Sequence, residues 1–191
     1  MSKYCFLLTG SNAAGKTTAI RNVLIDWEDD PRIENIRADN DSRFKSDAVE
    51  QRSVLTDIWL GPKQVLLIEG TRINTPLMDV AKKAKAHFNN ESPGVEFREL
   101  VVLMVTQKPD VMKQHLIDRC AKRNKKFRAD YWTLQKLEYE GSKRYPNSFR
   151  KNGIKAIEYR MGLDYAEQAT IVMYLRDRLA EILGEPQVVG R

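Results

Sequence analysis

Residues 10–17, Gly-Ser-Asn-Ala-Ala-Gly-Lys-Thr, constrain this chain more than any other stretch. They fit the pattern G-x-x-x-x-G-K-[ST], a loop whose backbone N–H groups wrap around a polyphosphate. Glycines at both ends permit backbone angles and a close approach that side chains would block. Lys16 is expected to reach the β- and γ-phosphates, and the Thr17 hydroxyl to help hold Mg²⁺. The residues expected to bind ATP are Gly10, Ser11, Asn12, Ala13, Ala14, Gly15, Lys16, Thr17 and Thr18.

The flanking sequence supplies the context that this motif requires. Residues 4–8 form an apolar run that is typical of a buried strand, and residues 18–24 have helical spacing. The N-terminus of such a helix points its partial positive charge at the bound anion. A chance occurrence of the pattern is the alternative. We interpret the segment as a strand, a loop and a helix that surround a nucleotide.

Length and composition are those of one globular domain over residues 1–191. No apolar run approaches the roughly 20 residues that span a bilayer, and no signal peptide is expected. Cys5 and Cys120 are too scattered for a disulfide framework, and two histidines without paired cysteines make a zinc site unexpected. We expect a cytoplasmic protein, in the host cytoplasm if it is viral, with no membrane partner. Its oligomeric state stays open.

Basic residues are concentrated in one part of the chain. Residues 107–155 hold 14 Lys or Arg against 5 Asp or Glu, whereas the formal charge of the whole chain is +6. A polyanion such as DNA is therefore expected to meet this segment. A solvated basic helix face is the alternative.

Apolar runs alternate with segments of helical spacing, which predicts an α/β fold with a five-stranded parallel sheet and helices on both faces. Pro146 is expected to stop the fifth of these helices. The last helix is expected to bury Ala169, Val172, Met173, Leu179 and Leu183. The predicted strands are 4–8, 34–38, 65–68, 100–105 and 156–159. The predicted helices run from 18 to near Trp27, from Ser46 to before Gly61, from Thr75 past Ala84, from Pro109 to the basic run, and over 130–145 and 165–183.

The carboxyl ends of parallel strands share one edge of the sheet, where ligands bind. This rule brings Asp39, Arg43, Glu69 and Arg72 to the phosphate loop. Phosphoryl transfer needs a group that deprotonates the attacking hydroxyl. Asp39, just after the second strand, is expected to be that base. Asp41 competes with it or binds substrate, and capping of the next turn is the alternative role for Asp39.

Glu69 follows four apolar strand residues, where an acid is seldom buried for packing alone. It is expected to join Thr17 in the Mg²⁺ shell or to act as a base. A structural ion pair is the alternative. Arg43 and Arg72 are expected to hold a phosphate of the acceptor, and a surface role is the alternative for each.

The run 122–128 holds five basic residues in seven, between two predicted helices. It is expected to form a basic lid, over about 122–130, that closes on the nucleotide and brings a cation to the transferring phosphoryl group. The spacing does not separate the candidates, and a hydrophilic helix connection is the alternative. These candidates are Arg119, Arg123, Lys126 and Arg128.

These pieces resemble the P-loop kinases of the nucleoside-monophosphate and thymidylate kinase group, and within it the kinase domain of phage polynucleotide 5′-hydroxyl kinases. Their second strand ends in an aspartate followed closely by an arginine, similar to Asp39 and Arg43. Their third strand ends in an acid before a Thr-Asn-type turn, similar to residues 69–74, and their lid carries a Lys-Arg-Asn-x-Lys-Arg run, similar to 122–126. The resemblance covers residues 1 to about 145 and implies a three-layer P-loop fold with ATP and Mg²⁺ as cofactors.

The sequence also departs from that family. Phe127 stands where the catalytic arginine of the lid would fall, and the arginine follows Asp39 by four residues instead of three. The phosphatase half of the polynucleotide enzymes is absent from this sequence. The chain also resembles phage DNA kinases that phosphorylate 5-hydroxymethyluracil bases. The aromatic residues Phe127, Tyr131 and Trp132 in the basic segment are candidates to stack on an extruded base, and a place in the core is the alternative for each.

Three functions are consistent with these patterns. The first is an ATP-dependent kinase of a DNA hydroxyl, either the 5-hydroxymethyl group of a modified uracil or a polynucleotide 5′-hydroxyl. The second is a kinase of deoxynucleoside monophosphates, which would use the same ATP site with a small acceptor. The third is an ATPase or switch module without an acceptor, which Asp39 and the basic run argue against.

Overall fold

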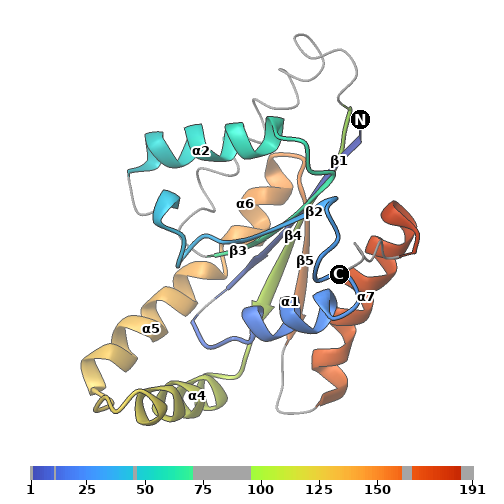
Figure 1. The fold of residues 1–191 in the computed structure, drawn as a ribbon. Helices are drawn as coiled ribbons and strands as arrows, with labels where there is room; N and C mark the ends of the chain where they lie inside the picture. The colour runs from blue at the N-terminus through green and yellow to red at the C-terminus, as the bar shows by residue number, and fades with distance from the viewer. Residues whose placement is uncertain (1, 11, 45–46, 71–95, 161–164, 186–191) are drawn as a thin grey trace.

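Five parallel strands form one sheet in the order β2-β3-β1-β4-β5 (Figure 1). The computed structural model describes residues 2–10, 12–44, 47–70, 96–160 and 165–185. The parallel sheet confirms what apolar strands separated by helices predict. The strands are β1 (Ser2–Thr9), β2 (Ile33–Arg37), β3 (Val65–Glu69), β4 (Glu96–Thr106) and β5 (Lys155–Arg160).

The described helices lie between the strands in the sequence, except α7, which follows β5. Helix α2 begins at Ala48, within two residues of the predicted start, because the Asp47 side chain caps it by accepting hydrogen bonds from the backbone N–H groups of Val49 and Glu50 at 2.8 and 3.1 Å. The helix predicted from Thr75 past Ala84 lies outside the described residues. The described helices are α1 (Lys16–Leu24), η1 (Ser42–Phe44), α2 (Ala48–Leu60), α4 (Pro109–Lys122), α5 (Ala129–Ser142), α6 (Tyr145–Lys151) and α7 (Tyr165–Leu183).

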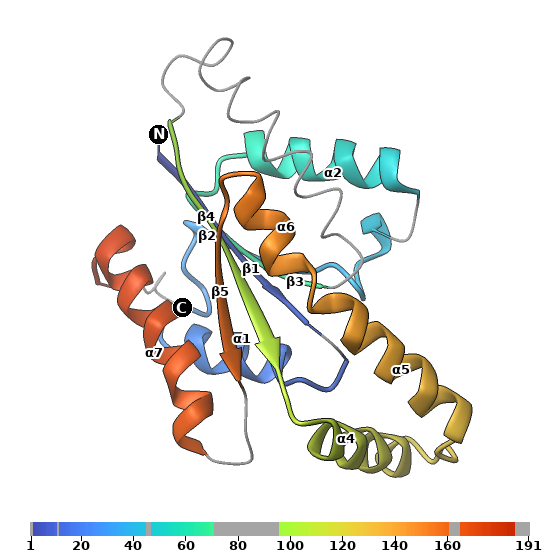
Figure 2. The ribbon, with the colours of Figure 1, turned by 180° about the vertical axis from the view of Figure 1, so that it is seen from behind.

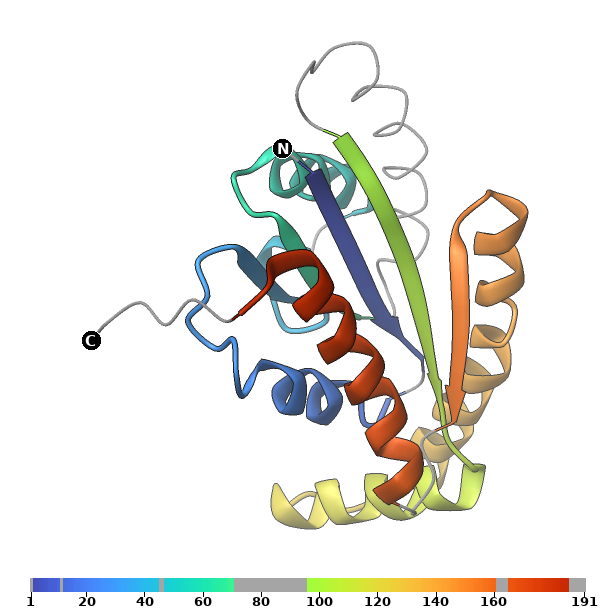
Figure 3. The same cartoon turned by 90° about the vertical axis from the view of Figure 1, so that its right-hand side faces the viewer.

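Helices cover both faces of the sheet, and each face has its own apolar core. Alternate side chains of a strand enter opposite cores, so Leu7 packs with residues of α2 and α6 while Leu8 packs with residues of α1 and α7. Figure 3 shows α1 and α7 on one side of the sheet and α6 on the other. Helices α4 and α5 differ from these, because they lie beyond the carboxyl ends of the strands (Figure 2).

Two predictions about the second half of the chain are wrong. Pro146 does not stop a helix but lies in the first turn of α6, where a proline needs no N–H partner. In α7 the predicted residues Ala169 and Met173 are exposed. Leu179 and Leu183 are buried as predicted, and the buried stripe continues through Ile171 and Leu175, so its members fall four residues apart. Val172 is partly buried beside that stripe.

Both cysteines are free, as expected, and Cys5 is buried in β1 while Cys120 is half-buried in α4. Burial raises the pKa of the Cys5 thiol well above its usual range. Among the described residues, no helix has the length and apolarity that crossing a membrane requires.

Gly10 is fixed by the close passage of a neighbouring strand. A Cβ built on Gly10 would lie 2.1 Å from the carbonyl oxygen of Val105 in β4, and its φ of 133° is one that L side chains rarely adopt. The glycine is therefore required by the sheet as much as by any bound phosphate.

We predict that Gly10→Ala lowers the free energy of unfolding by about 3 kcal/mol or more, because it combines backbone strain with overlap on a strand carbonyl. Urea denaturation followed by circular dichroism measures this change. Gly141→Ala is the matched control, since a Cβ there meets nothing within 4 Å. In the last turn of α5 it should leave stability unchanged or raise it by up to about 0.5–1 kcal/mol. Equal effects of the two variants would contradict the close approach.

Candidate active site

The carboxyl ends of β1, β2 and β3 lie level with one another. Leu8 and Arg37 both pair with Glu69 in the sheet register. The pairing continues one residue further, because Ala38 N–H donates to the Glu69 carbonyl at 2.8 Å and Gly70 N–H donates to the Leu8 carbonyl at 3.2 Å. The segments that follow these strands therefore leave the sheet at one place.

A cleft of about 800 Å³ opens at this edge, and Lys16, Asp39 and Glu69 all line it. It brings together the phosphate loop, the ends of β2, β3 and β4, and one face of α4. Of its 18 described lining residues, eight are exposed, so the cleft opens to solvent. The lining residues are Asn12, Ala13, Ala14, Gly15, Lys16, Thr17, Thr18, Arg21, Arg37, Asp39, Asn40, Glu69, Gln107, His115, Asp118, Arg119, Lys122 and Arg123.

The loop after β1 has the backbone form that a phosphate cradle needs. Gly15, with a φ of 91°, precedes α1, and Ala13 has a φ of 62°, and alternating left-handed residues of this kind are typical of anion-binding loops. Lys16 is buried, and its Nζ donates to the Gly10 carbonyl at 2.8 Å. Helix α1 starts at Lys16 with no acidic residue in its first turn, so its positive end is not neutralised there. Ser11 lies outside the described residues.

Thr17 and Glu69 are in direct contact across the cleft floor. The Thr17 hydroxyl donates to Oε1 of Glu69, while Oε2 of that buried carboxylate has no hydrogen-bond partner among the described residues. A buried carboxylate oxygen without a partner is costly unless a ligand satisfies it. Oxygen donors of this kind fit Mg²⁺, which keeps several waters and bound phosphates as further ligands. No group of three or more His, Cys, Asp or Glu side chains forms a metal cage in the described part of the chain.

Asp39 and Asp41, the two carboxylates considered for the base, are separated by the structure. Asp39 is exposed and lines the cleft. Asp41 does not line it and accepts from the Arg43 guanidinium, with Nη2 to Oδ2 at 2.7 Å. The hydrogen bond from Arg43 holds the pKa of Asp41 below its usual range. The Arg43 charge is thus shared with Asp41 outside the cleft, and Arg72 lies outside the described residues.

The four basic lid candidates also divide into two groups. Arg119 and Arg123, one helical turn apart at the end of α4, line the cleft. Lys126 and Arg128 do not, and they line a second cavity between α4 and α5. Arg128 is paired there with Asp130, its Nε lying 3.0 Å from Oδ1. Residues 123–128 of the basic run connect these helices, and all of them except the half-buried Phe127 are exposed.

The aromatic residues considered for base stacking are partly buried. Tyr131 and Trp132 both pack against a small cluster of Met112, Leu116 and Tyr139 that joins α4 to α5. Tyr131 also lines the second cavity, whereas Trp132 does not. The Nζ of Lys113 lies 6.0 Å from the centre of the Trp132 ring. Trp132 thus packs in this cluster with a cation near its ring.

The cleft also contains side chains that the sequence analysis did not select. Arg37 ends β2 and Gln107 follows β4, so the strand-end rule that found Asp39 and Glu69 could have found both. Gln107 is buried, and its Oε1 has no hydrogen-bond partner among the described residues. His115 had no signal in the sequence, since it lies in the middle of α4. Its Nδ1 is 3.4 Å from the Ala13 carbonyl oxygen of the loop.

Charge in the cleft favours an anion. Six basic side chains line it against three acidic ones. Two of the acids, Asp39 and Asp118, are exposed, and Glu69 is in contact with Thr17. A polyphosphate would meet the loop N–H groups, the α1 N-terminus and these cations together. The six basic residues of the described lining are Lys16, Arg21, Arg37, Arg119, Lys122 and Arg123.

Comparison with known proteins gives structural matches only. Neither a protein-family model nor a curated protein sequence matches this chain. A fungal RNA kinase matches with a TM-score of 0.62 at 14% identity, over 95% of this chain and 86% of that one. A candidate kinase from Chloroflexus aurantiacus matches with a TM-score of 0.54 at 15% identity, over 93% of this chain and 98% of that one. A deoxyadenosine kinase from M. mycoides matches with a TM-score of 0.47 at 13% identity, over 93% of this chain and all of that one.

The first two matches show that this chain shares the α/β fold of P-loop kinases at low sequence identity. A fold does not fix an activity, because function depends on the side chains at the site.

We predict that Thr17→Val lowers the free energy of unfolding by about 1–2 kcal/mol, because it removes the hydroxyl that satisfies a buried carboxylate oxygen of Glu69. Thr18→Val is the matched control: it is the same substitution on the next residue of α1, at an exposed position. It should change stability by less than about 0.5 kcal/mol. Chemical denaturation of both variants measures the difference. Equal stabilities would contradict a stabilising Thr17–Glu69 hydrogen bond.

Proposed function

We propose that this protein is an ATP-dependent kinase that transfers the γ-phosphate to a hydroxyl group of a nucleic acid. The observation that carries the proposal is the shared cleft of Lys16, Asp39 and the Thr17–Glu69 pair. Phosphoryl transfer needs a polyphosphate cradle, a metal site and a base facing the γ-phosphate, and these side chains could supply all three.

The donor would bind on the loop of residues 10–18. Lys16 would exchange its bond to the Gly10 carbonyl for one to the β- and γ-phosphates. Thr17 and Glu69 would hold Mg²⁺, which when bound neutralises charge on the phosphate oxygens. Arg119 and Arg123 line the same cleft. Their guanidinium groups would stabilise the negative charge that develops on the transferring phosphoryl group.

Asp39 would act on the acceptor. As the acceptor oxygen forms its bond to the γ-phosphorus, its proton passes to the Asp39 carboxylate. The bond from that phosphorus to the oxygen bridging to the β-phosphate breaks, and ADP leaves with the electron pair. Asp39 suits this role better than Asp41, because Asp41 is held by Arg43 away from the cleft.

Three observations support a nucleic acid as the acceptor. The cleft opens to solvent, as a long strand requires. The basic segment 107–155 includes α4 and α5, which lie at the same edge of the sheet (Figure 2). One protein of the same fold is a fungal RNA kinase. The hydroxyl would be the 5-hydroxymethyl group of 5-hydroxymethyluracil in DNA or the 5′-hydroxyl end of a polynucleotide.

The assay that tests the proposal supplies γ-labelled ATP with several acceptors in parallel: DNA that contains 5-hydroxymethyluracil, plain DNA and RNA with free 5′-hydroxyl ends, and deoxynucleoside monophosphates. We expect label on a polymer, with an acceptor KM that rises steeply with salt because bound counterions are released. Label on monophosphates alone would show a small-molecule kinase. ATP hydrolysis that no acceptor changes would show an ATPase module.

We predict that Lys16→Ala abolishes transfer, because a contact to the transferring phosphate is lost. Asp39→Asn should keep ATP binding and lower kcat by about 10²-fold or more, because the base is lost. Single-turnover transfer and ATP titration measure the two effects. Asp57→Asn, at an exposed position of α2 outside the cleft, is the control and should be unchanged. Normal turnover of Asp39→Asn would move the base to another carboxylate.

We predict that removing divalent metal with EDTA abolishes transfer and also removes most of the thermal stabilisation by ATP. Glu69→Gln should respond to Mg²⁺ at concentrations at least about tenfold higher than the unaltered protein, because a charged ligand of the ion is lost. Melting temperatures over a Mg²⁺ titration at fixed ATP measure this shift. An unchanged Mg²⁺ dependence would contradict the assignment of Glu69.

A further inference from the structure

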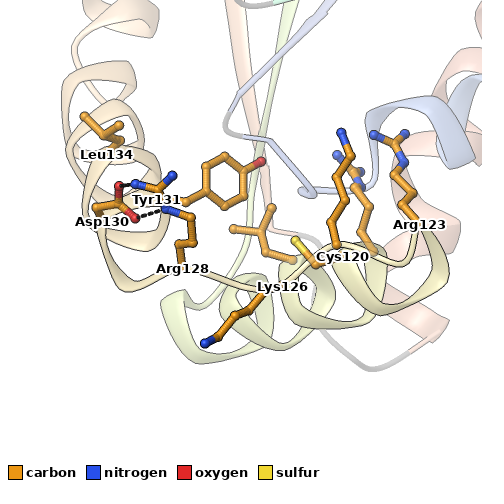
Figure 4. A pocket seen from close by; sticks show the side chains of 10 residues that line it. Cys120, Arg123, Lys126, Arg128, Asp130, Tyr131 and Leu134 are labelled. Atoms are coloured by element: carbon orange, nitrogen blue, oxygen red, sulfur yellow. Dashed lines mark hydrogen bonds and ion pairs between the residues drawn. The ribbon is translucent and has the colours of Figure 1, made fainter.

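A second cavity, of about 410 Å³, lies between α4 and α5. Its volume is within the roughly 300–1,000 Å³ of small-molecule sites. Figure 4 shows the side chains of both helices around it, with the Tyr131 ring between the Arg128–Asp130 pair and Cys120. Leu116, Cys120, Tyr131 and Leu134 supply apolar surface to the cavity. The phosphate loop does not contribute to the lining.

The charge of this cavity is strongly positive. Its one acidic residue, Asp130, is neutralised by two hydrogen bonds from Arg128. The hydrogen bonds from Arg128 lower the pKa of Asp130, so this carboxylate stays charged and paired. The basic residues of the lining are Arg119, Arg123, Lys125, Lys126 and Arg128. Among the described residues of the lining, these five cations thus face a single acid, which Arg128 already pairs.

The cavity combines this charge with an aromatic and an aliphatic wall. Leu134 is 61% exposed even though it lines the cavity, which is an unusual position for a large apolar side chain. A ligand with both an apolar face and negative charge would cover Leu134 and meet the lysines and arginines. Nucleotide units of a single strand have this chemistry, since each joins a flat base to a phosphate.

The second cavity is connected to the cleft through two shared side chains. Arg119 and Arg123 line both, because they project from the end of α4 between the two spaces. In Figure 4 the Arg123 guanidinium points toward the loop, whereas Lys126 points away from it. A strand whose hydroxyl reacts in the cleft could therefore place a following nucleotide in the second cavity.

We infer that the cavity between α4 and α5 is a binding subsite for a second nucleotide unit of a single-stranded acceptor. The unit stacks its base against Tyr131 and Leu134 and places its phosphate among the cations. This subsite rests on the proposed function for its place in the reaction, and it makes a polymer a better acceptor than a mononucleotide. Its ligand binds without ATP.

The test is binding of a fluorescein-labelled DNA single strand of about 12 nucleotides, followed by anisotropy in the absence of ATP. Leu134→Glu should raise the Kd about tenfold or more, because it puts a carboxylate against a phosphate and removes the apolar wall. Leu137→Glu is the matched control on the same helix: Leu137 is 65% exposed and does not line the cavity. It should raise the Kd less than twofold.

A second pair of variants tests the phosphate contact. Lys125→Ser should reduce the slope of log Kd against log salt by about one, the change expected when one phosphate contact is lost. Lys136→Ser removes an exposed lysine of α5 that does not line the cavity, and its slope should stay the same. Equal effects within either pair of variants would overturn the subsite.

Two further results would also overturn it. A rise in the KM for ATP in Leu134→Glu, with unchanged strand binding, would mean that the nucleoside of the donor occupies the cavity. Equal competition by polyglutamate would mean a general polyanion surface without base stacking. Because strand binding needs no turnover, failure of the kinase assay leaves this test intact. If Leu134→Glu does not change phosphoryl transfer to polymers, the subsite is refuted, whereas the proposed kinase activity is not.

Discussion

The close passage of β4 beside Gly10 is the constraint on which the rest of the site depends. A backbone carbonyl stands where a side chain would begin, so only glycine lets the chain leave β1 at this point. The loop then turns through two residues of positive φ and delivers Lys16 and Thr17 at the start of α1. Because β1 is central in the sheet, that start lies directly over the end of β3 and its Glu69.

Three polar side chains at this edge have a buried oxygen that no described residue hydrogen-bonds. These oxygens are Thr9 Oγ1, Glu69 Oε2 and Gln107 Oε1, which come at or just after the ends of three neighbouring strands. Elsewhere the central strands are almost entirely apolar and well buried. Buried polar atoms without partners are typical of functional sites, where stability is given up so that a ligand can complete the hydrogen bonds.

Helix α4 connects the two cavities to each other and to the loop. Its buried residues Met112 and Leu116 pack against α5, and His115 on the same helix approaches the loop carbonyl of Ala13. Arg119 and Arg123 belong to the linings of both cavities. A movement of α4 on binding in one cavity would therefore change the position of these side chains in the other. This arrangement places basic residues of the segment 107–155 in the linings of both cavities.

The sequence by itself determined the loop motif, the polar residues that follow the strands and several helix boundaries, because these features depend on neighbours along the chain. The motif at residues 10–17 and the Asp47 cap of α2 are local, and the parallel-sheet rule needed only strand ends to bring Asp39 to the same edge as Glu69. Only the tertiary structure decided which charged groups face the cleft. Asp41 pairs with Arg43 and Arg128 with Asp130 outside it, and the side of α7 that is buried was predicted incorrectly at Met173. Such choices depend on how helices pack against distant strands, and the spacing of residues within one segment does not encode that packing.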